Sequence, residues 1–311
     1  LRQTLLAFVS EFSSFDNGKN VNMIQLAQDL TQISAIELGI EDGNFSVIDP
    51  FSGGGSIPVE SYRLGNTTYA NDLNPIPVIL NTILLKIVPK YNQHFRECLL
   101  KAGNNLYKIA EKKLRRYYPF DKDGFEPIAY FRARTIICEG PNCGIKIPMI
   151  KKYGLSERDG YTSVIPKVNE NKNSIEFELF QGKKAHKLHK EGTVKRGKVI
   201  CPSCGFVHKA DSVKNQLRKK DGGANDAQIF AVILRNPKTG KRKIRLPEKD
   251  DLELIRLAEN EINNGNYFLP DDDFCVMSGV FNAPIYGMNK WWKLYTHRQI
   301  ITINTLFNSI P

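Results

Sequence analysis

The chain has 311 residues and a formal net charge of +11, with 41% hydrophobic and 25% charged residues. This composition is typical of a folded globular protein rather than of a disordered chain, and the length leaves room for two domains. No apolar run approaches the roughly 20 residues of a membrane span, and residues 1–15 contain no cleavage site of a secretory leader, so we expect a cytoplasmic protein without a membrane partner.

The first predicted helices lead into a glycine-rich corner. Apolar residues recur at helical spacing in residues 1–12 and again in residues 21–39, where Gly39 is placed to end the second helix. Two β-forming residues then precede the sequence Asp49-Pro-Phe-Ser-Gly-Gly-Gly-Ser56, and residues 57–64 again have helical spacing. This order predicts a strand, a glycine loop and a helix.

The glycine loop predicts a bound ligand. Its three consecutive glycines, residues 53–55, let the backbone adopt positive φ and let a ligand lie against the peptide groups. A triphosphate-binding loop is excluded because no lysine follows, and a dinucleotide fingerprint is excluded because Pro58 stands where its third glycine is needed. Asp72 follows a second predicted strand at residues 67–71, where doubly wound sheets present a carboxylate to the two hydroxyls of a ribose. We therefore expect a nucleoside ligand without a pyrophosphate.

This motif, together with Asn71-Asp-Leu-Asn-Pro75, resembles the S-adenosylmethionine site of class I DNA amino-methyltransferases, whose first motif reads D-P-F-x-G-x-G. More narrowly, the sequence resembles adenine-specific DNA methylases that carry an inserted zinc ribbon. The resemblance implies an α/β fold, a Rossmann-like doubly wound sheet with an inserted β-rich zinc-ribbon subdomain, and S-adenosylmethionine as cofactor. It also implies that the cofactor contacts come from Asp49, Pro50, Phe51, Ser52, Gly53, Gly54, Gly55, Asp72, Leu73 and Asn74. The alternative is that the glycines only permit tight packing.

Two close cysteine pairs mark the next region, after predicted helical stretches at residues 78–88 and 93–117. Cys138 and Cys143 are spaced C-x4-C-G, and Cys201 and Cys204 are spaced C-x2-C-G. Two such knuckles offer four thiolates to a tetrahedral zinc ion, so we expect a structural zinc site; unrelated reduced thiols are the alternative. Weaker candidate ligands are His186, His189 and His208, and the cysteines left over, expected only to be buried, are Cys98 and Cys275.

The positive charge is concentrated around the second cysteine pair. Residues 144–220 contain 18 Lys and Arg against 7 Asp and Glu, an excess equal to the net charge of the whole chain. Basic residues interleaved with glycine in this region favour contact with nucleic-acid phosphates, while a well-solvated insert is an equal alternative on charge alone. The neighbouring methylase motif favours DNA as the partner. The expected contacts are Lys195, Arg196, Lys198, Arg218, Lys219 and Lys220.

The end of the chain departs from the pattern of a complete methylase. After a predicted hairpin at 229–246 and a helix at 250–263 comes Asn282-Ala-Pro-Ile-Tyr286, which is close to, but not, the Asn-Pro-Pro-Tyr loop that holds the target amine and stacks on a flipped base. In the resembled family the block Y-G-M-x-x-W, here beginning at Tyr286, precedes that loop. We therefore assign no catalytic residue and expect an N-terminal part of a methylase, whose remaining C-terminal half is a missing segment or a separate chain.

The expected organisation is a cofactor-binding core at residues 1–119, a basic zinc-ribbon insert at 120–225 and a return to the core at 226–311. The expected function is S-adenosylmethionine-dependent methylation of the exocyclic amine of adenine in DNA. Methylation of RNA or of cytosine is an alternative, because the first motif does not name the base. A zinc-dependent nucleic-acid-binding module with a non-catalytic methyltransferase-like scaffold is an alternative from another class.

Overall fold

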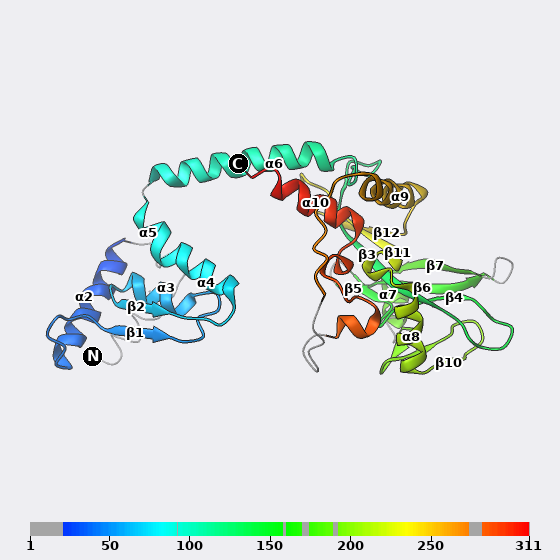
Figure 1. Ribbon diagram of the computed structural model, residues 1–311, viewed down its shortest axis with the longest axis horizontal. Coiled ribbons are helices and arrows are strands. Elements are labelled where there is room, and N and C mark those ends of the chain that lie inside the picture. The colour runs from blue at the N-terminus through cyan, green and yellow to red at the C-terminus, as the bar shows by residue number, and fades with distance from the viewer. Residues whose placement is uncertain are drawn as a thin grey trace. The chain divides into compact units, whose positions relative to one another are not determined.

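The computed structural model describes residues 21–91, 93–157, 160–169, 174–188, 192–273 and 282–310 (Figure 1). This part of the chain is mixed α/β and contains four sheets, which confirms the predicted fold class at its coarsest level. The chain divides into two compact units, residues 1–103 and 104–311. No helix within the described ranges combines the length and the apolar character needed to cross a membrane. The helix predicted at residues 1–12 lies outside these ranges.

The first unit is built on one β–α–β crossover. Strands β1 (Ser46–Asp49) and β2 (Thr67–Ala70) are parallel neighbours in full register, and α3 (Ser56–Arg63) connects them. The predicted strand, glycine loop, helix and second strand are thus confirmed. Within the described ranges no third strand pairs with β1 or β2, so the doubly wound sheet stays a prediction beyond this pair. The other helical segments of this unit are α2 (Val21–Glu37), α4 (Pro75–Thr82), a π-helical turn (Ile83–Ile87) and α5 (Val88–Lys90).

Helix ends in this unit follow from local side-chain chemistry. Gly39, with φ of 85°, follows the last turn of α2, as its position in the sequence predicted. The side chain of Asn74 accepts a hydrogen bond from the Ile76 N–H at 3.0 Å and caps α4. The long helix α6 (Gln93–Leu114) runs across the boundary between the two units.

The second unit contains three antiparallel sheets. The largest has the order β12-β11-β3-β4, and the hairpin predicted from residue 229 to 246 forms its β11–β12 edge. The others have the orders β5-β6-β7 and β10-β9-β8. Its strands are β3 (Glu126–Ile137), β4 (Lys146–Pro148), β5 (Gly154–Ser156), β6 (Thr162–Asn169), β7 (Ser174–Gln181), β8 (Val194–Lys195), β9 (Lys198–Ile200), β10 (Val207–His208), β11 (Ala227–Arg235) and β12 (Arg242–Arg245).

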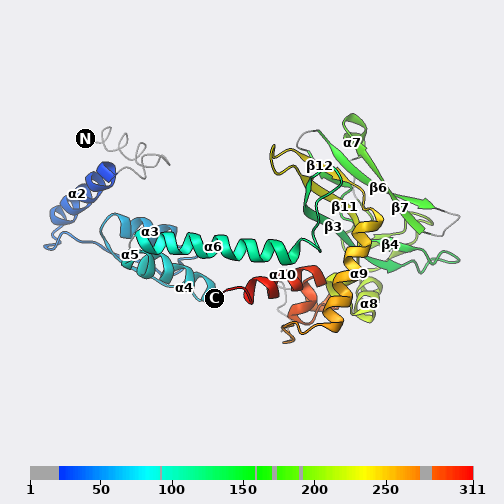
Figure 2. The same ribbon diagram turned by 90° about the horizontal axis from the view of Figure 1, so that it is seen from above.

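Figure 2 shows the helices of this unit beside its sheets. The α-helices are α7 (Lys183–Lys187), α8 (Ala210–Lys220), α9 (Lys249–Asn264) and α10 (His297–Phe307), and the 3₁₀ turns are Gly223–Asp226, Ala283–Tyr286 and Trp291–Leu294. Helix α8 buries Val213 and Leu217 against the hydrophobic cluster that contains the cysteines. Helices α9 and α10 pack through Ala258 and Ile301 around the buried ring of Tyr117.

Strand pairing connects distant parts of the sequence. Strand β11 pairs along its length with β3, so the sheet joins residues from both sides of the expected boundary at 225/226. Arg134 on β3 makes a two-pronged ion pair with Asp226, with N···O distances of 3.2 and 2.7 Å. The same guanidinium donates to the carbonyl of Tyr286 at 2.7 Å, which ties the C-terminal segment to β3. The three expected domains stay an interpretation of the sequence.

Candidate functional site

The glycine corner lies between the carboxyl end of β1 and the start of α3. Gly53 and Gly55 have φ of 48° and 81°, the left-handed region in which a side chain is strained, so two of the three glycines are required by the backbone. A Cβ on Gly53 or Gly54 would meet no atom of the described residues within 4 Å. The outer face of the corner is therefore open to a ligand.

Asp72 lies at the carboxyl end of β2 and bridges the two strand ends. Its Oδ2 accepts a hydrogen bond from the Gly53 N–H at 2.9 Å, and its Oδ1 accepts one from the Asn74 N–H at 2.8 Å. These two backbone hydrogen bonds lower the pKa of Asp72, and the bond from Asn74 has the larger effect. The carboxylate is therefore charged at neutral pH. Because each carboxylate oxygen has two acceptor sites, both oxygens keep capacity for a hydroxyl donor.

Asn81 is a residue of this corner that the sequence analysis missed. Its buried side-chain amide on α4 donates to Ser52 Oγ at 3.1 Å and to the Gly53 carbonyl at 3.2 Å. Its Oδ1 would lie only 2.2 Å from a Cβ on Gly55. The sequence signals Asn81 only as a polar residue in a mostly apolar helix. This signal marks the residue as unusual but does not predict its contact with the glycine loop.

The remaining predicted cofactor residues are divided between buried and exposed positions. Ser52 is buried, and the carboxylate of Asp49 accepts a hydrogen bond from the Phe51 N–H at 3.1 Å. The side chains of Phe51 and Leu73 are 85% and 98% exposed, on either side of the corner. The corner thus combines an open peptide surface, an oriented carboxylate that can accept hydrogen bonds and two uncovered apolar side chains.

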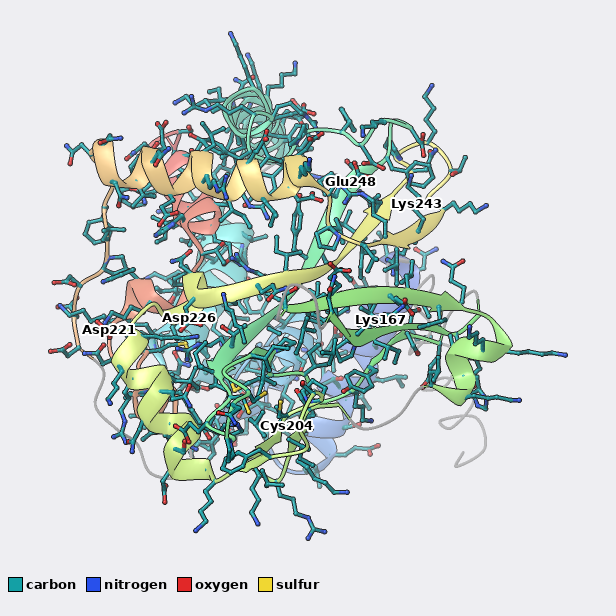
Figure 3. The ribbon with its side chains drawn as sticks, turned by 90° about the vertical axis from the view of Figure 1, so that its right-hand side faces the viewer. Lys167, Cys204, Asp221, Asp226, Lys243 and Glu248 are labelled. Atoms are coloured by element: carbon teal, nitrogen blue, oxygen red, sulfur yellow. The ribbon has the colours of Figure 1, made fainter. Side chains whose placement is uncertain are left out.

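The four predicted cysteines converge in the second unit. Their sulfur atoms all lie within 4.8 Å of one another, with Cys138 Sγ 3.5 Å from Cys204 Sγ and Cys143 Sγ 3.8 Å from Cys201 Sγ. Figure 3 labels Cys204 and draws the neighbouring sulfur atoms in yellow. Sulfur atoms around a tetrahedral zinc ion lie about 3.8 Å apart when Zn–S is about 2.3 Å. The cluster could hold a metal ion, and its geometry is compatible with zinc.

Backbone N–H groups point at the sulfur atoms, as expected for a thiolate site. The Gly140 N–H donates to Cys138 Sγ at 3.4 Å. The Ile145 N–H beside Cys143 lowers the pKa of that thiol to about 7. Burial raises the pKa of Cys138 and of Cys201, which makes an uncompensated thiolate costly at these two positions. A bound cation would supply the missing compensation.

Gly140 is a second residue that the sequence analysis missed. A Cβ on Gly140 would lie 2.9 Å from Cys204 Sγ, so only glycine lets the two knuckles approach. The sequence analysis named the glycines after each pair, whereas this one lies inside the first pair. The metal-ligating group in the described residues contains neither His186 nor His208, and His189 lies outside them, as does Cys275. Cys98 is exposed on α6, where burial was expected.

The predicted basic residues form two groups at opposite ends of α8. Lys195, Arg196 and Lys198 belong to the β8–β9 hairpin, whose Gly197 lies close to Ala210 at the start of the helix. The other three, Arg218, Lys219 and Lys220, end the helix. Eight to ten helical residues separate the groups by about 12 to 15 Å along the axis.

The ammonium group of Lys220 bonds to the sheet, whereas Arg218 bonds within its own helix, to Asn215 at 2.6 Å. Lys220 donates to the carbonyl and, at 2.9 Å, to the Oγ1 of Thr135 on β3. Lys220 is exposed as a residue, like the other five, but partial burial of its ammonium group lowers its pKa. Lys220 therefore holds α8 on the sheet and is not free to meet a phosphate group.

The segment that resembles a catalytic loop is used for packing. Residues Ala283–Tyr286 form a 3₁₀ turn, and Tyr286 packs against the cluster that contains the cysteines. A Cβ on the following Gly287 would lie 2.7 Å from the carbonyl of Leu217 on α8. The ring of Tyr286 is thus engaged in packing within the second unit.

Comparison with known proteins adds no family assignment, because no family model, curated protein or solved structure matches this chain. The function therefore rests on the chemistry of the glycine corner, the cysteine cluster and the basic residues.

Proposed function

We propose that the chain is the cofactor-binding and zinc-ribbon part of an S-adenosylmethionine-dependent DNA methyltransferase that acts on the exocyclic amine of adenine. One observation carries the proposal: the carboxylate of Asp72 at the end of β2 is oriented by the Gly53 N–H of the glycine corner at the end of β1. Parallel strands joined by a helix bring a glycine loop and a ribose-binding carboxylate to one edge of a sheet. The Rossmann-like sheet and the family resemblance are part of this proposal.

S-adenosylmethionine, when bound, supplies an electrophilic methyl group on a sulfonium centre. Asp72 would accept hydrogen bonds from the ribose hydroxyls, and the open faces of Gly53 and Gly54 would admit the methionine end. The exposed Phe51 ring and the exposed Leu73 side chain would cover apolar parts of the ligand. We assign no residue that holds the target amine, because Tyr286 is engaged in packing.

The second unit would bind zinc and DNA. Cys138, Cys143, Cys201 and Cys204 would hold the ion, which would fix the two knuckles against α8. Five exposed basic side chains at the two ends of α8 would contact DNA phosphates, with little dependence on sequence. Lys220, predicted as a sixth contact, would support the helix instead.

The first unit favours a partner that extends its sheet. Parallel strands are usually covered on both faces and rarely occur as an isolated pair, yet Ile48 of β1 and Tyr69 of β2 are 70% and 57% exposed. A C-terminal half of the methylase, as a further segment or a separate chain, would supply neighbouring strands and the Asn/Asp-Pro-Pro-Tyr loop. Strand pairing at the free edges of β1 and β2 would then complete the catalytic site.

The proposal is tested by titration calorimetry of the full chain with S-adenosylmethionine. We expect binding that is weakened at least tenfold by Asp72→Ala and unchanged by Asp42→Ala, a carboxylate before β1 at the opposite end of the sheet. We also expect no methylation of adenine in duplex DNA by this chain alone. Absence of binding heat, or equal affinity of the two variants, refutes the cofactor site.

A nucleic-acid-binding module is the second candidate, favoured by the separate second unit with its own cores and metal cluster. It requires DNA or RNA binding without any affinity for S-adenosylmethionine. The same calorimetry, combined with a DNA-binding titration, distinguishes it from the methyltransferase. Comparison of adenine- and cytosine-containing duplexes, and of RNA, distinguishes the target base once a chain that carries the proposed catalytic loop is added.

A further inference from the structure

A cavity of about 810 Å³ lies in the second unit, away from the cysteine cluster. It is open to solvent and is bordered by the end of α6, the segment after α9 and α10, and its lining includes Lys112, Lys113, Arg116, Tyr117, Ile301 and Asn308. Figure 2 shows α6 and α10 in this unit. Its size is that of a small-molecule site, for which about 300 to 1,000 Å³ is usual.

Tyr117 gives this cavity an unused hydrogen-bonding group. The residue is 1% exposed and packs its ring against Ala258 and Ile301, yet its hydroxyl has no hydrogen-bond partner among the described residues. A buried hydroxyl without a partner is unfavourable and is normally satisfied by a ligand or water. Burial raises the pKa of Tyr117, the neighbouring Arg116 charge opposes this rise and the Glu261 carboxylate adds to it, so the hydroxyl beside this ion pair stays protonated and can donate.

The charges that line the cavity favour an anion. Lys112, Lys113 and Arg116 line it, and Glu261 is the only acidic residue among the described residues of the lining. Glu261 is already used: it pairs with Arg116 at 3.0 Å and accepts a hydrogen bond from the Tyr267 hydroxyl at 2.8 Å. Neither lysine forms an ion pair with a described residue. Two cations are thus left for a ligand.

The other walls suit an aromatic body. The apolar side chains of Ile109 and Ile301 and the rings of Tyr117 and Tyr267 line the cavity, and Asn266 and Asn308 add amide groups. The Arg116 guanidinium lies over the Tyr117 ring, 4.7 Å from its centroid, which fixes both side chains. Flat apolar walls with amides next to cations are the surroundings that a base and its phosphate require.

We propose that this cavity binds a nucleotide, with the phosphate on Lys112 and Lys113 and the base against the half-buried Tyr267 ring. The Tyr117 hydroxyl donates to the ligand, and the ligand is either a free mononucleotide or one nucleotide of a single strand. This site is separate from the glycine corner and does not depend on methyltransferase activity.

The test is calorimetric titration of the full chain with adenosine monophosphate, with adenosine, with inorganic phosphate and with a short oligothymidylate. We expect the monophosphate to bind, and Tyr117→Phe and the double variant Lys112→Ala/Lys113→Ala each to weaken binding at least tenfold. Tyr117→Phe keeps the ring and removes a group without a partner, so its unfolding temperature should equal or exceed that of the wild type. The matched controls are Tyr107→Phe and Lys108→Ala, which lie on α6 outside the lining.

Each outcome decides the proposal. Binding of the monophosphate that the lining variants weaken supports a free nucleotide, and binding of the oligonucleotide alone with the same sensitivity supports a strand. Binding of neither, or binding that the lining and control variants change equally, refutes the site. Asp72→Ala should bind the monophosphate as the wild type does, so failure of this proposal and failure of the cofactor proposal are distinguishable.

Discussion

Replacing Gly55 by alanine should loosen the glycine corner, whereas replacing its neighbour Gly54 should not. Gly55 has φ of 81°, and its Cβ would lie 2.2 Å from Asn81 Oδ1. Gly54 has no positive φ, and a Cβ there would meet nothing within 4 Å. The two substitutions add the same methyl group one residue apart, so their difference isolates the geometry of the corner.

The magnitude follows from two contributions. An alanine in the left-handed region costs about 1 to 2 kcal/mol relative to glycine. The side chain of Asn81 must also rotate away from the new methyl group. This rotation breaks the two shortest hydrogen bonds of its amide, to Ser52 Oγ and to the Pro77 carbonyl, and each is worth about 1 kcal/mol net. The expected loss for Gly55→Ala is therefore about 3 to 4 kcal/mol, whereas Gly54→Ala should stay within about 0.5 kcal/mol of the wild type.

Hydrogen exchange of the backbone amides in residues 51–60 measures this difference locally. A loss of about 3 kcal/mol accelerates exchange through local opening by roughly two orders of magnitude. Adding Asn81→Ala removes the colliding oxygen, so in that background Gly55→Ala should cost only the left-handed term of about 1 to 2 kcal/mol. Equal exchange in the Gly55 and Gly54 variants, or an undiminished cost in the Asn81→Ala background, refutes the reasoning.

Three further predictions concern the metal, acid and salt. Metal analysis should find one zinc per chain, and Cys201→Ser should abolish it and destabilise the second unit by about 4 kcal/mol or more, whereas Cys98→Ser on exposed α6 should do neither. Because the pKa of Asp72 is lowered in the folded state, the stabilisation that its hydrogen bond to Gly53 gives is complete above the ordinary carboxyl pKa of 3.8. This stabilisation is lost as the pH falls through the lower pKa of the folded state. The chemical shift of the Gly53 amide should follow this titration in the wild type and not in Asp72→Asn. In DNA-binding titrations, Arg196→Ala/Lys198→Ala should reduce the slope of log affinity against log salt by about 2, because about 0.9 counterions are released per phosphate contact; an unchanged slope contradicts the assignment.

The glycine corner could be predicted from the sequence because its determinants are local. A strand, three glycines, a helix and a second strand follow one another within residues 46–70, and each has a composition signal. Asp72 could be added because the position of a carboxylate after the second strand is set by the crossover. Asn81 could not, since its contact with the loop depends on how α4 folds back, and no pattern in the sequence encodes that path.

The cysteine cluster was predictable for a different reason. Soft ligands at knuckle spacing are rare enough to identify a site across 57 intervening residues, whatever fills the gap. Gly140 was missed because its role is steric and arises only when the second knuckle packs against the first. The internal use of Lys220 was missed because charge patterning counts cations and does not reveal which of them bond to a neighbouring strand.

Long-range strand pairing sets the limit of the sequence analysis and bears on the function. The pairing of β3 with β11 puts the strand after the basic region into the same sheet as the strand before the first cysteine pair. The ion pair between Arg134 and Asp226, with side chains only 13% and 11% exposed, fastens that sheet next to α8. Helix α8 is held to β3 by Gln216, which accepts a hydrogen bond from the Ile137 N–H at 2.7 Å and donates one to the Ile137 carbonyl at 3.0 Å. The position of a DNA contact at the C-terminal end of α8 would therefore depend on this sheet. The basic residues at the end of α8 are thus held to the four-stranded sheet, and in DNA-binding titrations Gln216→Ala should weaken binding without removing any charge.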